Sequence, residues 1–98
     1  MIRVIIERHI REGCYQDYLE LIRKARKQAN RVEGFIAGEL LQEKENPNHA
    51  VIISSWENFE SWKTWLESKE RLSVLDEMRP LLEGDEEITV LESSQAMF

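Results

Sequence analysis

The chain has 98 residues, of which 42% are hydrophobic and 33% charged, and its net charge is −6 at pH 7. This length predicts a single domain over residues 1–98, with a core over about 2–92 and a tail over 93–98 whose Met97 and Phe98 are candidates to dock on a partner. The acidic balance argues against nucleic acid and against anionic membranes as partners, because both bind clustered Lys and Arg.

The single cysteine and the lack of long apolar runs limit the cellular compartments in which we expect the protein. Cys14 is the only cysteine, which rules out an internal disulfide and fits a reducing environment. The apolar start, Met1–Glu7, is too short for a signal peptide, and no stretch approaches the ~20 apolar residues of a membrane span. By elimination we expect a cytoplasmic protein. No His or Cys pattern has metal-ligand spacing, so no metal is expected.

The first half of the chain predicts a strand, a helix and two further strands. Residues 2–10 are rich in Ile and Val and read as a strand, and the break at Arg11-Glu12-Gly13 precedes a helix over 15–32 with apolar residues every three or four positions. Residues 35–44 and 50–56 then form two strands, with a turn predicted at Asn46-Pro47-Asn48.

The second half predicts helices and one more strand. Asn58 is a plausible cap for a helix carrying aromatic side chains, and Ser68 caps a further helical stretch, although Arg71 stands where a capping box would place an acid. Pro80 ends that stretch, and residues 88–91 form the last strand.

This order is β-α-β-β-α-β, which predicts an α+β domain of the ferredoxin-like type with an antiparallel sheet and its helices on one face. The runs Val4–Ile6 and Val51–Ile53 are continuous β-branched stretches, which indicates that both faces of their strands are covered. The helices cover one face. A second subunit is the simplest cover for the other, so we expect a homodimer through the sheet face.

Tryptophans mark the segment Ser55–Ser68, which closes a strand with Trp56, opens a helix with aromatics and reaches a Trp-Leu-x-Ser step at Trp65. Together with the Gly13 break and the order of elements, this segment resembles the antibiotic biosynthesis monooxygenase (ABM) domain. The resemblance implies a dimeric α+β barrel with a pocket between helices and sheet. Its members include cofactor-independent oxygenases of anthrone- or quinol-like substrates, heme-degrading monooxygenases and proteins of unknown role.

The heme-degrading branch fits this chain poorly. The resemblance matches its heme-packing Trp to Trp65, but its heme-ligating His falls on Leu75, which cannot bind iron. That branch also uses an Asn in the first strand, where this chain has Ile6, Glu7 and Arg8 instead. We therefore expect no heme degradation of that type and no bound cofactor.

Aromatic residues of the second helix and the start of the first are the candidate substrate-binding groups. Phe59, Trp62 and Trp65 lie three residues apart and are candidates for a wall against a flat substrate, with Trp65 also a catalytic candidate by the resemblance. Tyr18 is a candidate hydrogen-bond donor to a substrate oxygen. Core packing at helical spacing is the simpler interpretation for Phe59, Trp62 and Tyr18. For Trp65, core packing and substrate binding are balanced.

Two residues of strand one are further catalytic candidates. His9 has the side chain to take a proton from a phenol near neutral pH, although a solvated surface position is the simpler reading. Arg8 shares a side with Ile6 and Ile10 by the period of two, so its charge must be paired or lie at a pocket mouth, and Glu39 is a candidate partner.

Other chemistry-bearing residues are assigned structural or surface roles. Trp56 is expected in the core, His49 on the surface of a turn, and Cys14 half-buried before the first helix. The acidic run is read as a solvated turn without chemistry; its members are Glu83, Asp85, Glu86 and Glu87.

The sequence therefore favours a cofactor-independent monooxygenase acting on a small aromatic or quinol-like molecule. The alternative is a non-catalytic dimeric protein of the same fold that binds a small molecule or serves in stress. A heme-binding protein that uses another ligand, such as His9, is a third possibility.

Overall fold

The computed structural model describes residues 1–94, and the predicted docking of Met97 and Phe98 lies outside this range. The strands and helices are β1 (Ile2–His9), α1 (Tyr15–Ala29), β2 (Phe35–Glu43), β3 (Asn46–Trp56), α2 (Phe59–Leu66), α3 (Lys69–Met78), the short 3-10 helix η1 (Arg79–Leu81) and β4 (Glu87–Glu92). This confirms the predicted ferredoxin-like α+β fold.

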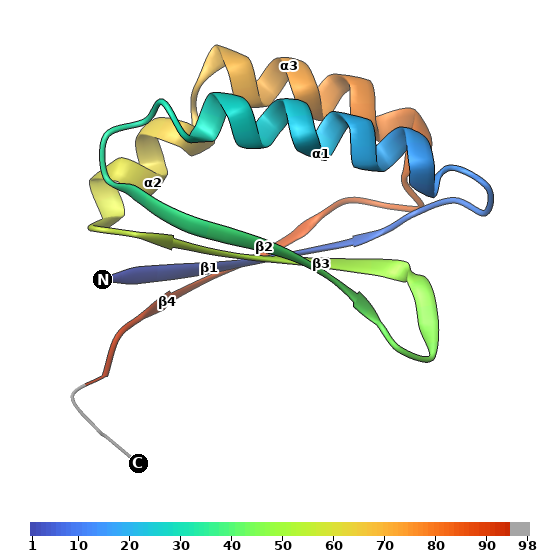
Figure 1. The fold of residues 1–98 in the computed structure, drawn as a ribbon, viewed down its shortest axis with the longest axis horizontal. Coiled ribbons are helices and arrows are strands. Elements are labelled where there is room, and N and C mark those ends of the chain that lie inside the picture. The colour runs from blue at the N-terminus through green and yellow to red at the C-terminus, as the bar shows by residue number, and fades with distance from the viewer. Residues whose placement is uncertain (95–98) are drawn as a thin grey trace.

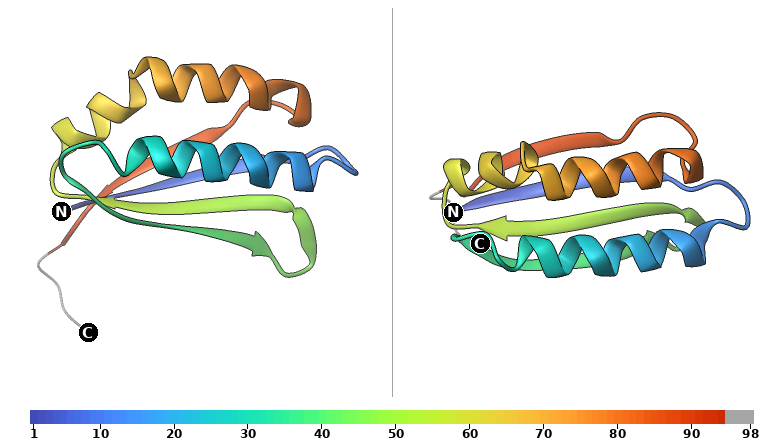
Figure 2. Two further views of the ribbon diagram at one scale, coloured as in Figure 1. Left: turned by 45° about the horizontal axis from the view of Figure 1, so that its top comes forward. Right: turned by 90° about the horizontal axis from the view of Figure 1, so that it is seen from above.

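The four strands form one antiparallel sheet in the order β2-β3-β1-β4. All helices lie on one side of this sheet (Figure 1). α1 and α3 lie side by side above it (Figure 2) and are tied by an ion pair between Lys24 and Glu77, 3.0 Å apart.

The predicted turn at Asn46-Pro47-Asn48 is wrong, since β3 begins at Asn46 and the turn centres on residues 44–45. Pro47 is tolerated there because the pairing of β3 with β1 ends at His49, so the missing N–H of Pro47 breaks no bond with β1.

Side chains alternate between the two faces of β1. Ile2, Val4, Ile6 and Arg8 are buried under the helices. Ile5 points to the other face, where the pairing register places Ile53 opposite it. No helix covers this second face, which we call the open face (Figure 1).

The core under the helices has two clusters. One gathers around the tryptophans of β3 and α2, and the other around Tyr18 of α1 and Met78 of α3. β1 contributes to the first cluster, and Ile10, just beyond it, contributes to the second. The candidate site lies where the two clusters meet.

Candidate functional site

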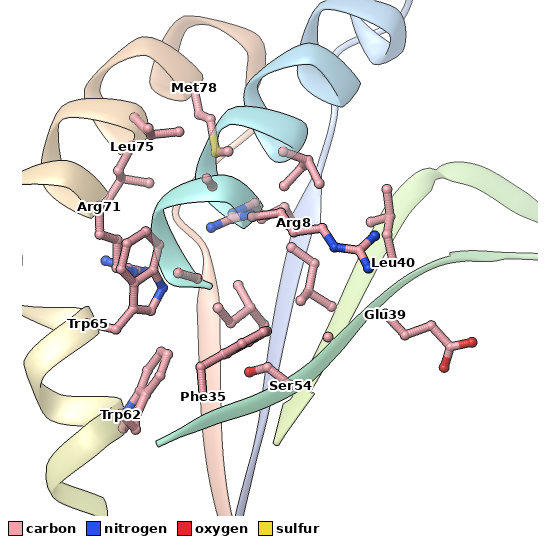
Figure 3. A pocket seen from close by; sticks show the side chains of 18 of the residues that line it. Arg8, Phe35, Glu39, Leu40, Ser54, Trp62, Trp65, Arg71, Leu75 and Met78 are labelled. Atoms are coloured by element: carbon pink, nitrogen blue, oxygen red, sulfur yellow. The ribbon is translucent and has the colours of Figure 1, made fainter. Parts of the chain in front are cut away.

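A cavity of about 130 Å³ lies between the sheet and the helices, with lining residues from β1, β2, β3 and all three α-helices (Figure 3). Arg26 of α1 is exposed and belongs to its lining, so the cavity reaches solvent beside α1. A cavity of similar size, about 150 Å³, in another protein takes up benzene, so this one has room for a single aromatic ring.

Aromatic side chains form one wall of the cavity. Trp62 and Trp65 of α2 lie three residues apart and are both buried. Trp62 packs edge-on against Trp56, with ring centroids 5.8 Å apart, and the Trp56 indole N–H donates to Ser54 Oγ over 3.0 Å. Phe35 completes the wall by packing edge-on against Trp56. These contacts hold the rings in fixed orientations against which a flat ligand can stack.

Ser68 connects the aromatic wall to α3. Its hydroxyl donates to the backbone carbonyl of Trp65 over 2.7 Å and accepts the backbone N–H of Arg71 over 3.1 Å. Ser68 thereby caps α3 as predicted and fixes the bend between α2 and α3. Trp65 and Arg71 consequently both reach the same cavity (Figure 3).

A cluster of charged side chains lies at the cavity beside this wall. Arg8 is 5% and Arg71 6% exposed, and both line the cavity. Both bind Glu86: Arg8 donates through Nε and Nη2 to Oε1, over 3.1 and 2.7 Å, and Arg71 donates through Nη2 to Oε2, over 2.6 Å. The remaining Arg8 nitrogen, Nη1, donates to the Tyr18 hydroxyl over 3.0 Å. One carboxylate thus serves two buried cations.

The cluster changes the acidities of its members. Burial alone would raise the pKa of Glu86, but the charges of Arg8 and Arg71 and the hydrogen bonds they donate outweigh burial, so this pKa lies below its ordinary value. Burial raises the pKa of the Tyr18 hydroxyl, and the charge of Arg8 offsets only part of that rise. At neutral pH Glu86 is therefore ionised and Tyr18 is neutral.

Three of the candidates from the sequence, Trp62, Trp65 and Arg8, come together at the cavity. Tyr18 is fully buried, lies outside the lining and contacts the cavity only through the hydrogen bond from Arg8. Phe59 is 47% exposed and also lies outside the lining.

His9 lies on the open face, because it alternates with the buried Arg8 along β1. Its ring stacks on that of His49, with centroids 4.6 Å apart. His49 in turn bonds Glu43 over 2.8 Å and Glu7 over 3.1 Å, and chiefly the bond to Glu43 raises the His49 pKa. The sheet therefore separates both histidines from the cavity.

The predicted partner of Arg8 is wrong, since Glu86 and not Glu39 binds it. Glu39 pairs with Ile53 in the register, so its side chain belongs to the open face and points away from the cavity (Figure 3). The prediction that Glu86 belongs to a solvated turn is also wrong, because only 12% of its side chain is exposed.

Arg71 and Glu86 were not among the sequence candidates. Arg71 is followed at helical steps by Val74, Leu75 and Met78, which all line the cavity, and this spacing already places it on the apolar face of α3. Glu86 precedes Ile88 by two residues, so the alternation along an extended chain places both side chains on the same side of the sheet.

Among residues 1–94, no group of three or more His, Cys, Asp or Glu side chains is placed to hold a metal ion. Leu75 lines the cavity at the position where the heme-degrading branch has its ligand. Within the same described part of the chain, no helix is long and apolar enough to cross a membrane.

Sheet topology, one-sided helices and an apolar cavity between them define a ferredoxin-like α+β domain with a small-molecule-sized pocket. The chain belongs to the antibiotic biosynthesis monooxygenase family, which it matches over residues 1–76. The resemblance inferred from the Ser55–Ser68 segment is thus confirmed.

Two curated relatives are similar over most of this chain. Protein SchA of Streptomyces halstedii is 29% identical over 83 residues, which is 85% of this chain and 22% of SchA. The 42.8 kDa protein in the whiE locus of Streptomyces coelicolor is 27% identical over 75 residues, which is 76% of this chain and 19% of that protein. The chain thus matches only about a fifth of the length of either relative.

Solved structures share the fold at low sequence identity. A conserved protein from Methanosarcina mazei Go1 superposes with a TM-score of 0.89 at 20% identity, covering 95% of this chain and 92% of that chain. SnoaB, a cofactor-independent oxygenase from Streptomyces nogalater, superposes with a TM-score of 0.85 at 18% identity, covering 98% of this chain and 95% of SnoaB. At these identities the likeness establishes the fold alone.

Proposed function

We propose that this chain is a cofactor-independent monooxygenase that oxidises a small aromatic or quinol-like molecule in the cavity. The observation that carries the proposal is the placing of an aromatic wall, Trp62 and Trp65, beside the buried guanidinium of Arg71 in one enclosed space. Family membership and the fold shared with SnoaB support it.

The reaction balances without an external reductant. In an anthrone-like substrate, an activated CH₂ conjugated to a phenol or ketone becomes C=O; in a hydroquinone, a ring C–H becomes C–OH and the ring is oxidised to the quinone. In both cases one atom of O₂ enters the product and the other leaves as water. The substrate supplies all four electrons. The protein's task is to hold the deprotonated, electron-rich form of the substrate in a dry site where O₂ can reach it.

Arg71 and Arg8 supply the positive charge that stabilises the deprotonated substrate. A net positive charge next to the ring lowers the pKa of a bound phenol or enol and stabilises its anion. Glu39 is the only acid among the described lining residues, and its side chain points away, so the substrate's proton passes to water at the opening. Trp62 and Trp65 orient the ring and exclude water around it.

Oxygen uptake by the purified protein over a panel of anthrones and hydroquinones tests the proposal. We expect uptake with at least one panel member, and its loss in Trp65→Ala. Phe59→Ala is the matched control, because Phe59 is on the same helix but outside the cavity, and this variant should retain uptake. Absence of uptake across the panel would favour a non-catalytic protein that binds a small molecule.

We also propose that two copies pair through their open faces. Ile5, Val51 and Ile53 form a half-buried apolar centre on this face, flanked by the exposed Leu41 and Leu91. Along β1 the same face runs from Arg3 to Glu7, with Ile5 between them. A two-fold axis near Ile5 would place Arg3 of one copy opposite Glu7 of the other, so the surface is complementary to itself.

A further inference from the structure

The charges at the cavity do not balance. Arg8 and Arg71 carry two positive charges, and their only acidic partner among the described residues is Glu86. Arg26, at the opening, adds a further positive charge, whereas the carboxylate of Glu39 lies on the open face. A buried charge is stable only when it is paired or coordinated, so a cavity with a surplus cation favours an anionic ligand.

The surplus charge has free donors that reach the cavity. All three guanidinium nitrogens of Arg8 are engaged with Glu86 or Tyr18. Arg71 uses only Nη2, and no residue among 1–94 accepts a hydrogen bond from its Nε or Nη1. Because no fully buried side-chain nitrogen in that part of the chain lacks a partner, these two atoms face accessible space. Only 6% of Arg71 is exposed and the residue lines the cavity, which points to the cavity as that space.

The neighbourhood of Arg71 also defines what the anion is attached to. Ser68 bonds both the Arg71 backbone N–H and the Trp65 carbonyl, which places the two residues at the same bend, and Glu86 holds the Arg71 guanidinium. Both side chains line the cavity. The cavity volume of about 130 Å³ has room for one ring and not for a fused three-ring system without rearrangement.

We propose that the cavity selects single-ring aromatic carboxylates, with the carboxylate accepting a hydrogen bond from one free nitrogen of Arg71, Nη1 or Nε, and the ring against Trp65. Guanidinium groups bind carboxylates by charge-assisted hydrogen bonds, which are stronger than bonds between neutral groups. That such a molecule is then oxidised rests on the proposed monooxygenase function, whereas its binding does not.

Titration calorimetry of the full chain with 4-hydroxybenzoate and with the neutral isostere 4-hydroxybenzamide tests the charge selection. At about pH 7 only the first carries a charge. We expect 4-hydroxybenzoate to bind about 10-fold more tightly or better. Equal affinities, or a preference for the amide, would overturn the proposal.

Substitutions test whether Arg71 causes the preference for the carboxylate. Arg71→Met should abolish the preference for 4-hydroxybenzoate. Arg79→Met, which removes an exposed arginine at the end of α3, should keep it. If circular dichroism shows that Arg71→Met does not fold, Arg71→Lys decides: it keeps the charge but not the planar fork, and we expect weaker 4-hydroxybenzoate binding by about 3-fold or more. Unchanged affinity in Arg71→Lys would contradict the assignment.

The two proposals fail separately. Oxygen uptake with a neutral hydroquinone, without any preference for the carboxylate in calorimetry, would sustain the oxygenase and overturn the anion site. A preference for the carboxylate that needs Arg71, without uptake across the panel and without uptake of a hydroquinone carboxylate such as 2,5-dihydroxybenzoate, would sustain the anion site and overturn the oxygenase.

Discussion

Arg8 and Arg71 bind opposite oxygens of one carboxylate, with Arg8 Nη2 2.7 Å from Oε1 of Glu86 and Arg71 Nη2 2.6 Å from Oε2. Arg8 is part of β1, Arg71 is part of α3, and Glu86 immediately precedes β4. Glu86 therefore joins three elements through charge-assisted hydrogen bonds, and the cluster is both a structural link and a wall of the cavity.

Glu86→Gln should destabilise the fold. The amide is similar in size to the carboxylate but carries no charge, so two buried guanidiniums lose their only acidic partner among the described residues. We expect the free energy of unfolding to fall by about 3 kcal/mol, measured by urea denaturation. Glu87→Gln, at an exposed neighbouring position, is the control and should change it by less than about 0.5 kcal/mol. Equal effects of the two substitutions would show that the cluster adds no stability.

The same carboxylate predicts a loss of stability in acid. The folded-state pKa of Glu86 lies below its ordinary value of 4.5, so the unfolded chain takes up this proton at a higher pH than the folded chain. The stabilisation is complete above the unfolded pKa and is lost as pH falls through the folded pKa. Denaturation midpoints of wild type and Glu86→Gln between about pH 7 and about pH 3 should converge at the acidic end. A constant difference between them would mean that another group causes the acid sensitivity.

Gly34→Ala should be more damaging than Gly13→Ala. Both glycines have positive φ, +93° and +82°, where an L side chain is strained by about 1 kcal/mol. A Cβ on Gly13 would meet nothing within 4 Å, whereas one on Gly34 would lie 2.7 Å from the Ser61 Cβ and closer still to its Oγ. We expect a larger drop in melting temperature for Gly34→Ala.

Ser61→Gly provides the matching test of that clash. Combined with Gly34→Ala, it removes the side chain that a Cβ would strike, so the double variant should be more stable than the sum of the single effects predicts. Simple additivity would mean that backbone strain alone explains the cost of Gly34→Ala.

Ile53→Arg should separate the proposed dimer. Ile53 pairs with Ile5 at the centre of the open face, and a charge there cannot be buried against a second copy. Light scattering at micromolar concentration should give the mass of a dimer for wild type and of a monomer for the variant. Leu72→Arg, at an exposed apolar position on the helical side, should remain a dimer. A monomeric wild type would contradict the dimer itself.

Most of the fold could be predicted because periodicity and capping are local properties. The alternation around Arg8 and the Ser68 cap are both visible in a short window of sequence, and the structure contains both. The boundaries were less certain where two signals compete, as at Asn46-Pro47-Asn48, whose turn-forming residues lie in a strand.

The charged cluster could be predicted only in part. That Arg8 needs a partner follows from its side of the strand, but which acid it meets depends on the order of the strands, and Glu86 is 78 positions further along the chain. Arg71 lies three residues after the Ser68 cap, where a capping box would have an acid, and also on the apolar face of α3, and only the second property places it at the cavity. The same alternation that buries Arg8 places His9 on the open face.

Glu86 also lies beyond residues 1–76, the stretch that matches the family. The acid that pairs both arginines of this pocket is thus supplied by the segment that follows the matched stretch. In this chain, a single change just before the last strand would therefore alter the charge of the binding chamber without altering any residue of the matched stretch. The aromatic wall and the charge beside it are thus supplied by separate segments of this chain, so that either can be altered without changing the sequence of the other.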